Sequence, residues 1–490
     1  MAILNIGESL YTRSIKDLIK RIHDATPVRD SVYEMASDYY KNLPDQKAEI
    51  ARIEAKIQNA QDTLSKTTRK PVIADLEDQI KGWKIELKNF HTEIDNQRIK
   101  RRNKLVQVCL DILDLLDGAN FLEENNRAAK LLGTVFMIQP DEGRRRLTLN
   151  GRAKHLYKAC LSLRLLDRLL SADLIKDPFI KNRADILKQS QNGNVEMAQA
   201  TYRDDIKIPL IMACLLQDIG RMHPDAQRIL HGPDRNMNEF RTLSLEERTQ
   251  LLQITSIQTM LFVRDGIGLG RYVGNSREER DQFVRLEQLR LSFILRVIKS
   301  SITGEGDIGD LIKIPQIYSS VVLSTKENNQ LHQTPLAMMI LKRGAESGRF
   351  SKAGVAALLS IVGIFPQGFG IAYIPADASD GDRYEYAVVN GLYPPKFDEP
   401  LCRRVTRNLQ YYPNGNNVNI SRKYNLYFPE ARHKLEKMSR ERLLEILEKL
   451  CFDFEERKNQ DLIPRCWHPY HYFSDERHQN LWGRTQVESN

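Results

Sequence analysis

The sequence has few cysteines, few tryptophans and no long apolar run, and these shortages exclude several classes of protein. Its six cysteines form no Cys-x-x-Cys pair, which argues against a disulfide framework and predicts a reducing compartment, by default the cytoplasm. No stretch approaches the roughly 18 apolar residues of a membrane span, and the mean hydropathy is -0.47. The N-terminus lacks a basic region followed by an apolar core, so no secretion signal is expected.

What is present fits an ordinary globular chain. Its 490 residues are 41% hydrophobic and 28% charged, enough for about two to four domains. The net charge is +9, but the 73 basic and 64 acidic residues are interleaved. The densest basic clusters, within 98–102 and at 144–146, are expected to be solvated surface rather than anion sites, and nucleic-acid binding is not the expected role.

The first hundred residues carry an apolar seam with alternating spacings of three and four. Before Pro71 the seam consists of Ile50, Ile53, Ile57, Ala60 and Leu64, and after it of Ile73, Leu76, Ile80, Trp83, Leu87, Phe90 and Ile94. This spacing is typical of a coiled coil, and Pro71 suits the first turn of a new helix. The pattern favours an antiparallel hairpin. The alternative is one kinked rod that dimerises in parallel. Either form predicts an interaction element for a protein partner or a second copy.

Residues 105–150 have a mixed pattern. Helices are expected at 106–116 and 126–132, followed by strands at 134–138 and 146–149 that flank a turn. This predicts a small α+β unit, either a connector or a winged-helix-like module that would bind DNA through its arginines.

The rest of the chain is helical up to about residue 365 and then alternates. A small β module is expected from about 370 to 428, with strands within 371–374, 384–389, 405–411 and 424–428, and Ser439 should cap a helix over 440–450. The aromatic tail after Cys451 should dock on the body. We therefore expect a mainly α protein in five parts: N-terminal helix and coiled-coil hairpin (1–104), α+β unit (105–150), all-helical domain (151–368), β module (369–430) and C-terminal helix with tail (431–490).

Three stretches of the helical part resemble one family. Met212–Arg221 reads MACLLQDIGR and is similar to the LLHDIGK signature of HD-domain phosphohydrolases, with Gln217 in place of the histidine. Gly306–Ser320 resembles the helix that supplies a late aspartate ligand, and the segment from Ala345 to Gly368 resembles the closing segment. Their order and spacing over about 150–430 resemble the HD-GYP family of bacterial signalling phosphodiesterases, which implies an HD-like helical domain and a link to cyclic di-GMP.

The residues that the chemistry of this family requires are missing. HD enzymes cluster metals on histidines and aspartates, and the metals generate hydroxide. Here Gln217 replaces the histidine, Gln316 replaces the late aspartate, and no histidine occurs between His231 and His332. Asp218 alone cannot hold a dinuclear centre. The resemblance therefore implies vestigial positions, with no catalytic residue and no metal or other cofactor.

Two histidine groups and one glycine run are further candidate sites. His223 and His231 flank the Asp-Ile-Gly turn and are expected at the surface or in a cap. The tail residues Cys466, His468, His471 and His478 lack the paired spacing of structural zinc sites, so aromatic docking is favoured. Gly266–Gly270 follows no strand and lacks a Lys-Ser ending, which predicts a flexible turn rather than a phosphate loop.

Four functions follow. The first is an inactive HD-GYP-like regulatory or scaffold protein that acts through protein–protein interaction. The second is a receptor for a cyclic dinucleotide, with Arg221, Arg264 or Lys299 contacting phosphate. The third is a phosphodiesterase with a rearranged metal set, and the fourth is nucleic-acid binding through 105–150.

Overall fold

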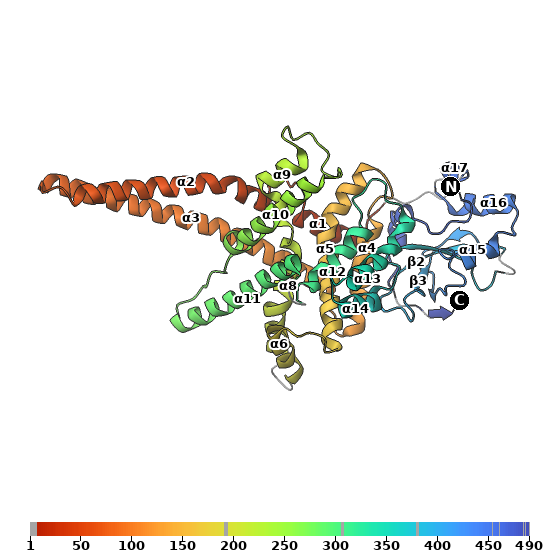
Figure 1. Cartoon of the computed structure of the whole chain (residues 1–490). Coiled ribbons are helices and arrows are strands. Elements are labelled where there is room, and N and C mark those ends of the chain that lie inside the picture. Colours follow the sequence, from red (N-terminus) through yellow and green to blue (C-terminus); the bar gives the residue numbers. More distant parts are fainter. Residues whose placement is uncertain are drawn as a thin grey trace. The chain divides into compact units, whose positions relative to one another are not determined.

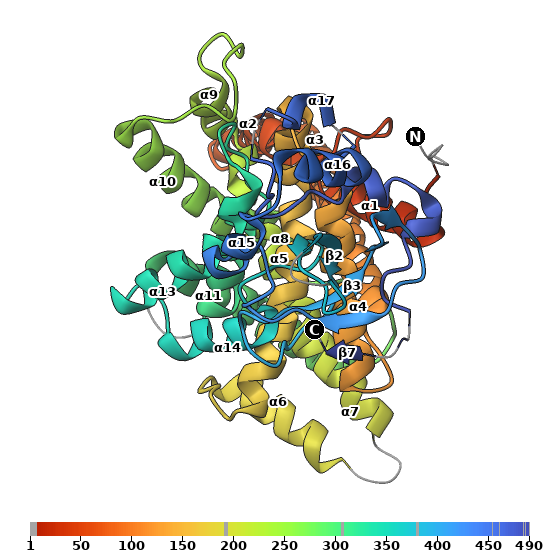
Figure 2. The ribbon, with the colours of Figure 1, turned by 90° about the vertical axis from the view of Figure 1, so that its right-hand side faces the viewer.

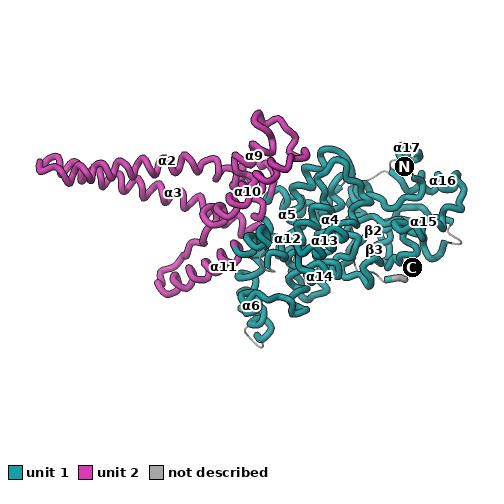
Figure 3. Tube along the Cα trace, viewed as in Figure 1, with its two compact units in different colours: residues 1–22, 109–215, 296–490 teal, residues 23–108, 216–295 magenta. Residues whose placement is uncertain are grey.

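The computed structural model is mainly helical, with a small sheet towards the C-terminus (Figure 1). It describes residues 7–190, 195–304, 308–378, 382–452, 454–459, 461–483, 485 and 487–489. Two compact units, each built from distant parts of the sequence, make up the chain (Figure 3). Unit 1 comprises residues 1–22, 109–215 and 296–490, and unit 2 comprises 23–108 and 216–295. The mainly α class and the late β module are confirmed, whereas this grouping differs from five consecutive parts.

Unit 2 is helical throughout. Its elements are α2 (Val32–Leu64), most of α3 (Lys70–Leu116), the 3-10 turn η2 (Ile219–Met222), α9 (Pro224–His231), α10 (Leu245–Leu261), the π turn η3 (Phe262–Ile267) and most of α11 (Arg277–Thr303). Ser31 begins α2 with a capping box shared with Glu34.

Helices α2 and α3 form an antiparallel hairpin that extends away from the other helices of unit 2 (Figure 3). Its core is a cluster of Ile53, Ile57, Ala60 and Ile80, against which Leu64, Leu76, Trp83 and Leu87 pack. Pro71 is the second residue of α3, where a missing N–H is tolerated. The apolar seam is thus used between two helices of one chain, so a second copy would have to bind a different face.

Unit 1 is built around α5. Its helices are α1 (Leu10–Ile22), α4 (Phe121–Met137), α5 (Gly143–Ser171), α6 (Pro178–Gln189), α7 (Val195–Tyr202), η1 (Arg203–Lys207), α8 (Ile208–Leu216, whose last residue falls in unit 2), α12 (Asp310–Val322), η4 (Leu331–Leu336), α13 (Ala337–Glu346) and α14 (Lys352–Val362), with the ends of α3 and α11. Helix α5 packs against α1, α4, α12 and α14 (Figure 2). Its middle is buried on every face, down to the side chain of Arg164, which is 1% exposed.

The strands expected at 134–138 and 146–149 are absent, and this prediction is wrong. Residues 134–137 complete α4, and 146–149 lie inside α5. The β-branched run at Thr134 and Val135 favours a strand locally, but both side chains are fully buried in a helix, because tertiary packing overrides intrinsic propensity. A DNA-binding wing therefore has no structural basis in 105–150.

The β module is a five-stranded sheet in the order β1-β2-β3-β6-β7. Its strands are β1 (Gly370–Tyr373), β2 (Glu385–Val389), β3 (Leu401–Arg404), β6 (Asn417–Asn419) and β7 (Val487–Ser489), beside a small pair, β4 (Thr406–Arg407) and β5 (Gln410–Tyr411). All main-sheet pairs are antiparallel except β6–β7. The strand expected at 424–428 is reduced to a bridge between Asn425 and Tyr373, and β3 was not predicted.

The C-terminal part follows the sequence prediction more closely. It contains α15 (Pro429–Leu435), α16 (Arg440–Leu450), α17 (Phe454–Arg457), α18 (Tyr470–Phe473) and η6 (Glu476–His478). Ser439 caps α16 by accepting a hydrogen bond from the backbone N–H of Arg442. The tail docks on the sheet, because Trp467 stacks on Tyr386 with ring centroids 4.7 Å apart and donates to the carbonyl oxygen of Ala387 at 3.2 Å.

Candidate functional site

The Asp-Ile-Gly turn lies in unit 2, directly after α8, and packs against the backbone of α10. The backbone N–H of Gly220 donates to the Thr259 hydroxyl at 3.0 Å, and this hydroxyl donates to the Gln217 carbonyl at 3.4 Å. A Cβ atom on Gly220 would lie 2.2 Å from the carbonyl oxygen of Thr255. Gln217 is 4% exposed. The turn is therefore closed on the side of α10.

Aromatic side chains of α2 cover the same turn. Tyr33 is 3% exposed. Burial raises its pKa, the Asp218 carboxylate adds to this effect and Arg221 opposes it, which places all three groups in one neighbourhood. Tyr40 donates to the carbonyl oxygen of Gln258 at 2.8 Å, and its ring lies 5.3 Å from that of His223. The turn is therefore packed between α2 and α10.

The other residues singled out by the resemblance belong to different compact units. Gln316 lies in α12 of unit 1, where its carbonyl oxygen accepts from the hydroxyls of Ser319 and Ser320, while Gln217 and Asp218 belong to unit 2. Gly306 and Asp307 of the resembling stretch lie outside the described residues. Among the residues that are described, no group of three or more His, Cys, Asp or Glu side chains is arranged to hold a metal.

The three phosphate-binding candidates lie on three different elements. Arg221 and Lys299 are exposed, in η2 and α11 respectively. Arg264 is held by its neighbour Asp265 through two hydrogen bonds of 2.7 Å. Arg221 and Arg264 belong to unit 2 and Lys299 to unit 1.

The basic cluster at 98–102 is a structural clamp, not solvated surface as predicted. Three arginines of α3 donate to carbonyl oxygens at the end of η3 and just after it: Arg98 to Ile267 and Leu269, Arg101 to Gly266 and Arg102 to Gly268. Burial lowers the pKa of Arg101 to about 10, and its guanidinium lies 4.9 Å from the ring of Tyr39. The glycine run at 266–270 is thus anchored, where the sequence predicted a flexible turn.

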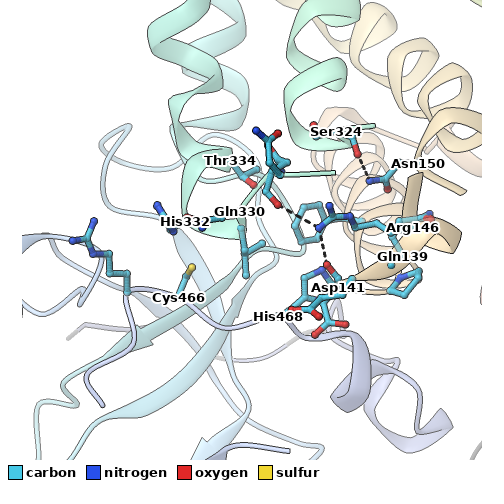
Figure 4. Close-up of a pocket in the computed structure, with 18 of the residues that line it drawn as sticks. Gln139, Asp141, Arg146, Asn150, Ser324, Gln330, His332, Thr334, Cys466 and His468 are labelled. Carbon is cyan, nitrogen blue, oxygen red and sulfur yellow. Dashed lines mark hydrogen bonds between the residues drawn. The ribbon is translucent and has the colours of Figure 1, made fainter. Parts of the chain in front are cut away.

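Sequence reasoning missed a cavity of about 910 Å³ in unit 1 (Figure 4). Its walls come from the turn and first residues of α5, from the loop between α12 and η4, and from the tail between α17 and α18. The tail's Cys-x-His-x-x-His motif was the available signal, because Cys466, His468 and His471 all line the cavity together with His332.

Arg146 holds two of the cavity walls together. Its guanidinium donates to the carbonyl oxygens of Asp141 at 2.7 Å, Lys326 at 3.2 Å and Glu327 at 3.3 Å. The side-chain amide of Asn150 donates to the carbonyl oxygen of Ser324 at 2.8 Å (Figure 4). The loop that follows α12 is therefore fastened to α5.

Two tail side chains in the cavity, His468 and Cys466, are held in their neutral forms. His468 stacks on Phe136 with centroids 5.7 Å apart, and its Nδ1 accepts from the backbone N–H of Tyr470 at 3.2 Å. Burial lowers the pKa of His468 to about 4 and raises that of Cys466 to about 12. Because Nδ1 is an acceptor, Nε2 of the neutral ring is a donor.

No protein-family model, no curated protein and no solved structure matches this chain. The resemblance to the HD-GYP family therefore depends on the three sequence stretches alone. No helix in the described part of the chain has both the length and the apolar character needed to cross a bilayer.

Proposed function

We propose that the chain is a catalytically inactive HD-GYP-like regulatory or scaffold protein, of the bacterial signalling type, that acts through protein–protein interaction. The observation that carries the proposal is the closed Asp-Ile-Gly turn. Gly220 has no room for even a methyl group against α10, and buried Tyr33 lies beside Asp218. A hydrolytic metal centre would need space there for metal, water and substrate.

The ligand chemistry of the turn supports the same proposal. Gln217 offers a neutral amide where an imidazole would bind a transition metal, and one carboxylate at Asp218 leaves a metal short of ligands. The carbonyl oxygen of Gln217 and the N–H of Gly220 are taken up by Thr259. The turn's polar groups therefore serve packing.

The hairpin is the interaction element in this proposal. The arginines of α3 bind the base of the hairpin to the rest of unit 2. The base is therefore held in a fixed position, while the tip is available to a partner. Beyond the base, its outer faces carry charged residues of both signs and two exposed apolar side chains, Val72 at 39% and Ile85 at 53%. Mixed charge with scattered apolar residues suits a protein surface better than nucleic acid.

A shortened hairpin tests this function. Replacing residues 54–83 by a short Gly-Ser turn removes the tip and keeps the arginine clamp. Affinity purification of the full chain and the shortened chain should recover a defined partner with the full chain only, and sedimentation velocity would reveal a second copy as the partner. The matched control is Ile85→Lys, which alters the outer face and retains the tip.

Two results would contradict the proposal. One is an unchanged set of bound partners, including self-association, after the tip is removed. The other is stoichiometric metal in the purified protein together with hydrolysis of a cyclic dinucleotide, which would support the rearranged phosphodiesterase. The receptor alternative predicts a calorimetric signal with cyclic dinucleotides that Arg264→Gln weakens.

A further inference from the structure

We propose that the outer face of α13 docks unit 1 on an anionic lipid surface. Leu336, Met339 and Ile340 would enter the layer between headgroups and acyl chains, and neighbouring basic side chains would contact the headgroups. This inference goes beyond the proposed scaffold function. It depends on no residue of the hairpin or of the Asp-Ile-Gly turn, so either proposal can fail without the other.

The first observation is an exposed apolar surface beside α13. Leu336 is the last residue of η4, and Met339 and Ile340 follow it in α13 at spacings of three and four, which places the three side chains on one helical face. Phe397 extends this surface, because the Lys342 ammonium lies 5.5 Å from the centre of its ring. The four apolar side chains, which we call the α13 face, are 40–52% exposed. A contiguous group of this kind is typical of an interaction surface.

The helix beneath the α13 face is packed without the help of these side chains. Its opposite side is buried through Ala337, Met338, Leu341, Gly344 and Ala345. The ring of Phe350 fills the space beside Gly344, where a Cβ atom would lie 2.1 Å from a ring carbon. Figure 2 shows α13 at the outer edge of unit 1. The exposed apolar groups can therefore bind a partner without any change in the fold.

The second observation is the charge around the α13 face. Residues 331–352 contain a single acidic side chain, Glu346, and four Lys or Arg side chains, all exposed: Lys342, Arg343, Arg349 and Lys352. The backbone N–H of Arg349 donates to the carbonyl oxygen of Gly344 at 2.9 Å, so the chain turns back and brings Arg349 beside the end of α13. The apolar side chains thus have a basic surround.

The carboxylates next to Phe397 do not reverse this charge. Glu399 is paired with Lys396 at 3.1 Å, and Asp398 lies 3.8 Å from Arg422. In both pairs the cation is more exposed to solvent than the carboxylate. The charge that the α13 face presents is therefore complementary to an anionic surface.

The composition of the surface favours lipid over an acidic protein. Protein interfaces are enriched in aromatic residues and depleted of lysine, whereas the centre of this surface is aliphatic and Lys342, Lys352 and Lys396 surround it. Anionic headgroups attract lysine and arginine alike and require no fixed geometry. Aliphatic side chains enter the boundary between headgroups and acyl chains.

Flotation of the full chain with lipid vesicles tests the proposal. One set of vesicles is pure phosphatidylcholine, and the other contains equal parts of phosphatidylcholine and phosphatidylserine. We expect binding to the mixed vesicles that is at least about tenfold stronger than binding to phosphatidylcholine alone, because several basic side chains contribute. Rising salt concentration should release the protein, since exposed charges are screened.

Two variants separate the apolar and the basic parts of the surface. Met339→Ser and Arg343→Gln should each weaken binding to the mixed vesicles by about three- to tenfold. Their matched controls are Met197→Ser and Arg440→Gln, which change exposed residues of α7 and α16 in unit 1 and should bind as the wild type does. All four positions are at the surface, so circular dichroism should report an unchanged fold.

Three results would overturn the proposal. The first is no binding to either set of vesicles, and the second is equal binding to both. The third is an equal loss of binding in Met339→Ser and Met197→Ser, because that result would indicate non-specific adsorption. If the chain binds an acidic protein through Met339 and Arg343 but binds no vesicle, then the α13 face is a protein interface and the lipid proposal is wrong.

Discussion

The backbone N–H of Gly220 donates to the hydroxyl of Thr259 across 3.0 Å, which joins the turn after α8 to the last turn of α10. The contact is close because Gly220 has no side chain, and the α10 backbone occupies the space that a Cβ would need. The geometry thus gives this glycine a packing role, and that role can be measured.

Gly220→Ala should destabilise the protein by about 1–3 kcal/mol, because the new methyl group overlaps the carbonyl oxygen of Thr255 and α10 must move. Urea unfolding of the purified variant measures the change. Gly82→Ala is the matched control, since Gly82 lies inside α3 with nothing within 4 Å of its Cβ position. It should stabilise by about 0.5–1 kcal/mol. If Gly220→Ala leaves the free energy of unfolding unchanged, then the turn is not packed as described.

Some of this architecture was predictable from local pattern. The apolar spacing from Ile53 to Leu87 predicted the two helices of the hairpin, and Ser439 predicted the start of α16. Each of these signals is carried by residues that are close together in the sequence. The covering of the Asp-Ile-Gly turn was not predictable in this way. Tyr33 and Asp218 are distant in sequence, and their proximity depends on how α2 folds back onto η2.

The arginines illustrate the same limit. A run such as Arg98 to Arg102 looks like solvated surface, since its partners are backbone carbonyl oxygens about 170 residues away that carry no sequence signature. The cavity could not be predicted from the sequence either, because the start of α5 and the tail, which both line it, are far apart along the chain. The sequence carries only two local features of the cavity wall, the basic run at 144–146 and the Cys-x-His-x-x-His motif of the tail.

A buried ion pair of the arginine clamp should contribute more to the stability of the fold than an exposed ion pair of the hairpin. Arg102→Leu should destabilise by about 2–3 kcal/mol, because it removes one partner of Glu287, whose side chain is 4% exposed. Glu287 keeps its ion pair with Arg290 at 3.1 Å and its bond from the N–H of Gly270 at 2.6 Å. Arg52→Leu, which breaks an exposed pair with Glu49 on the hairpin, should cost at most about 1 kcal/mol. Thermal unfolding of both variants checks this. Equal costs would mean that Arg102 is solvated.

Thiol reactivity gives a prediction about the cysteines. Burial raises the pKa of Cys160 to about 12 and that of Cys214 to about 11, so neither forms the reactive thiolate at pH 8. Cys451 and Cys466 are both partly exposed, but burial raises the pKa of Cys466 to about 12. We therefore expect iodoacetamide at pH 8 to label Cys451 well before the other cysteines. Mass spectrometry of peptides after a timed reaction measures the order, and the urea-unfolded protein, in which all six should react alike, is the control.

His468 predicts a loss of stability in acid. Its pKa is lowered to about 4 in the folded protein, because burial outweighs the opposing effect of the Asp141 carboxylate, while the unfolded imidazole titrates near 6.5. Between these values the unfolded chain binds more protons, so the contribution is fully present above pH 6.5 and is lost as the pH falls towards 4. Up to about 3 kcal/mol is at stake.

His468→Asn isolates this contribution, because an Asn oxygen can accept from the N–H of Tyr470 as Nδ1 does but does not titrate. Urea unfolding at several pH values should give a shallower dependence between pH 6.5 and 4 for the variant than for the wild type, whatever its absolute stability. His433→Asn, at an exposed histidine of α15, should retain the wild-type slope. If His468→Asn retains it as well, then His468 is not held neutral in the cavity wall.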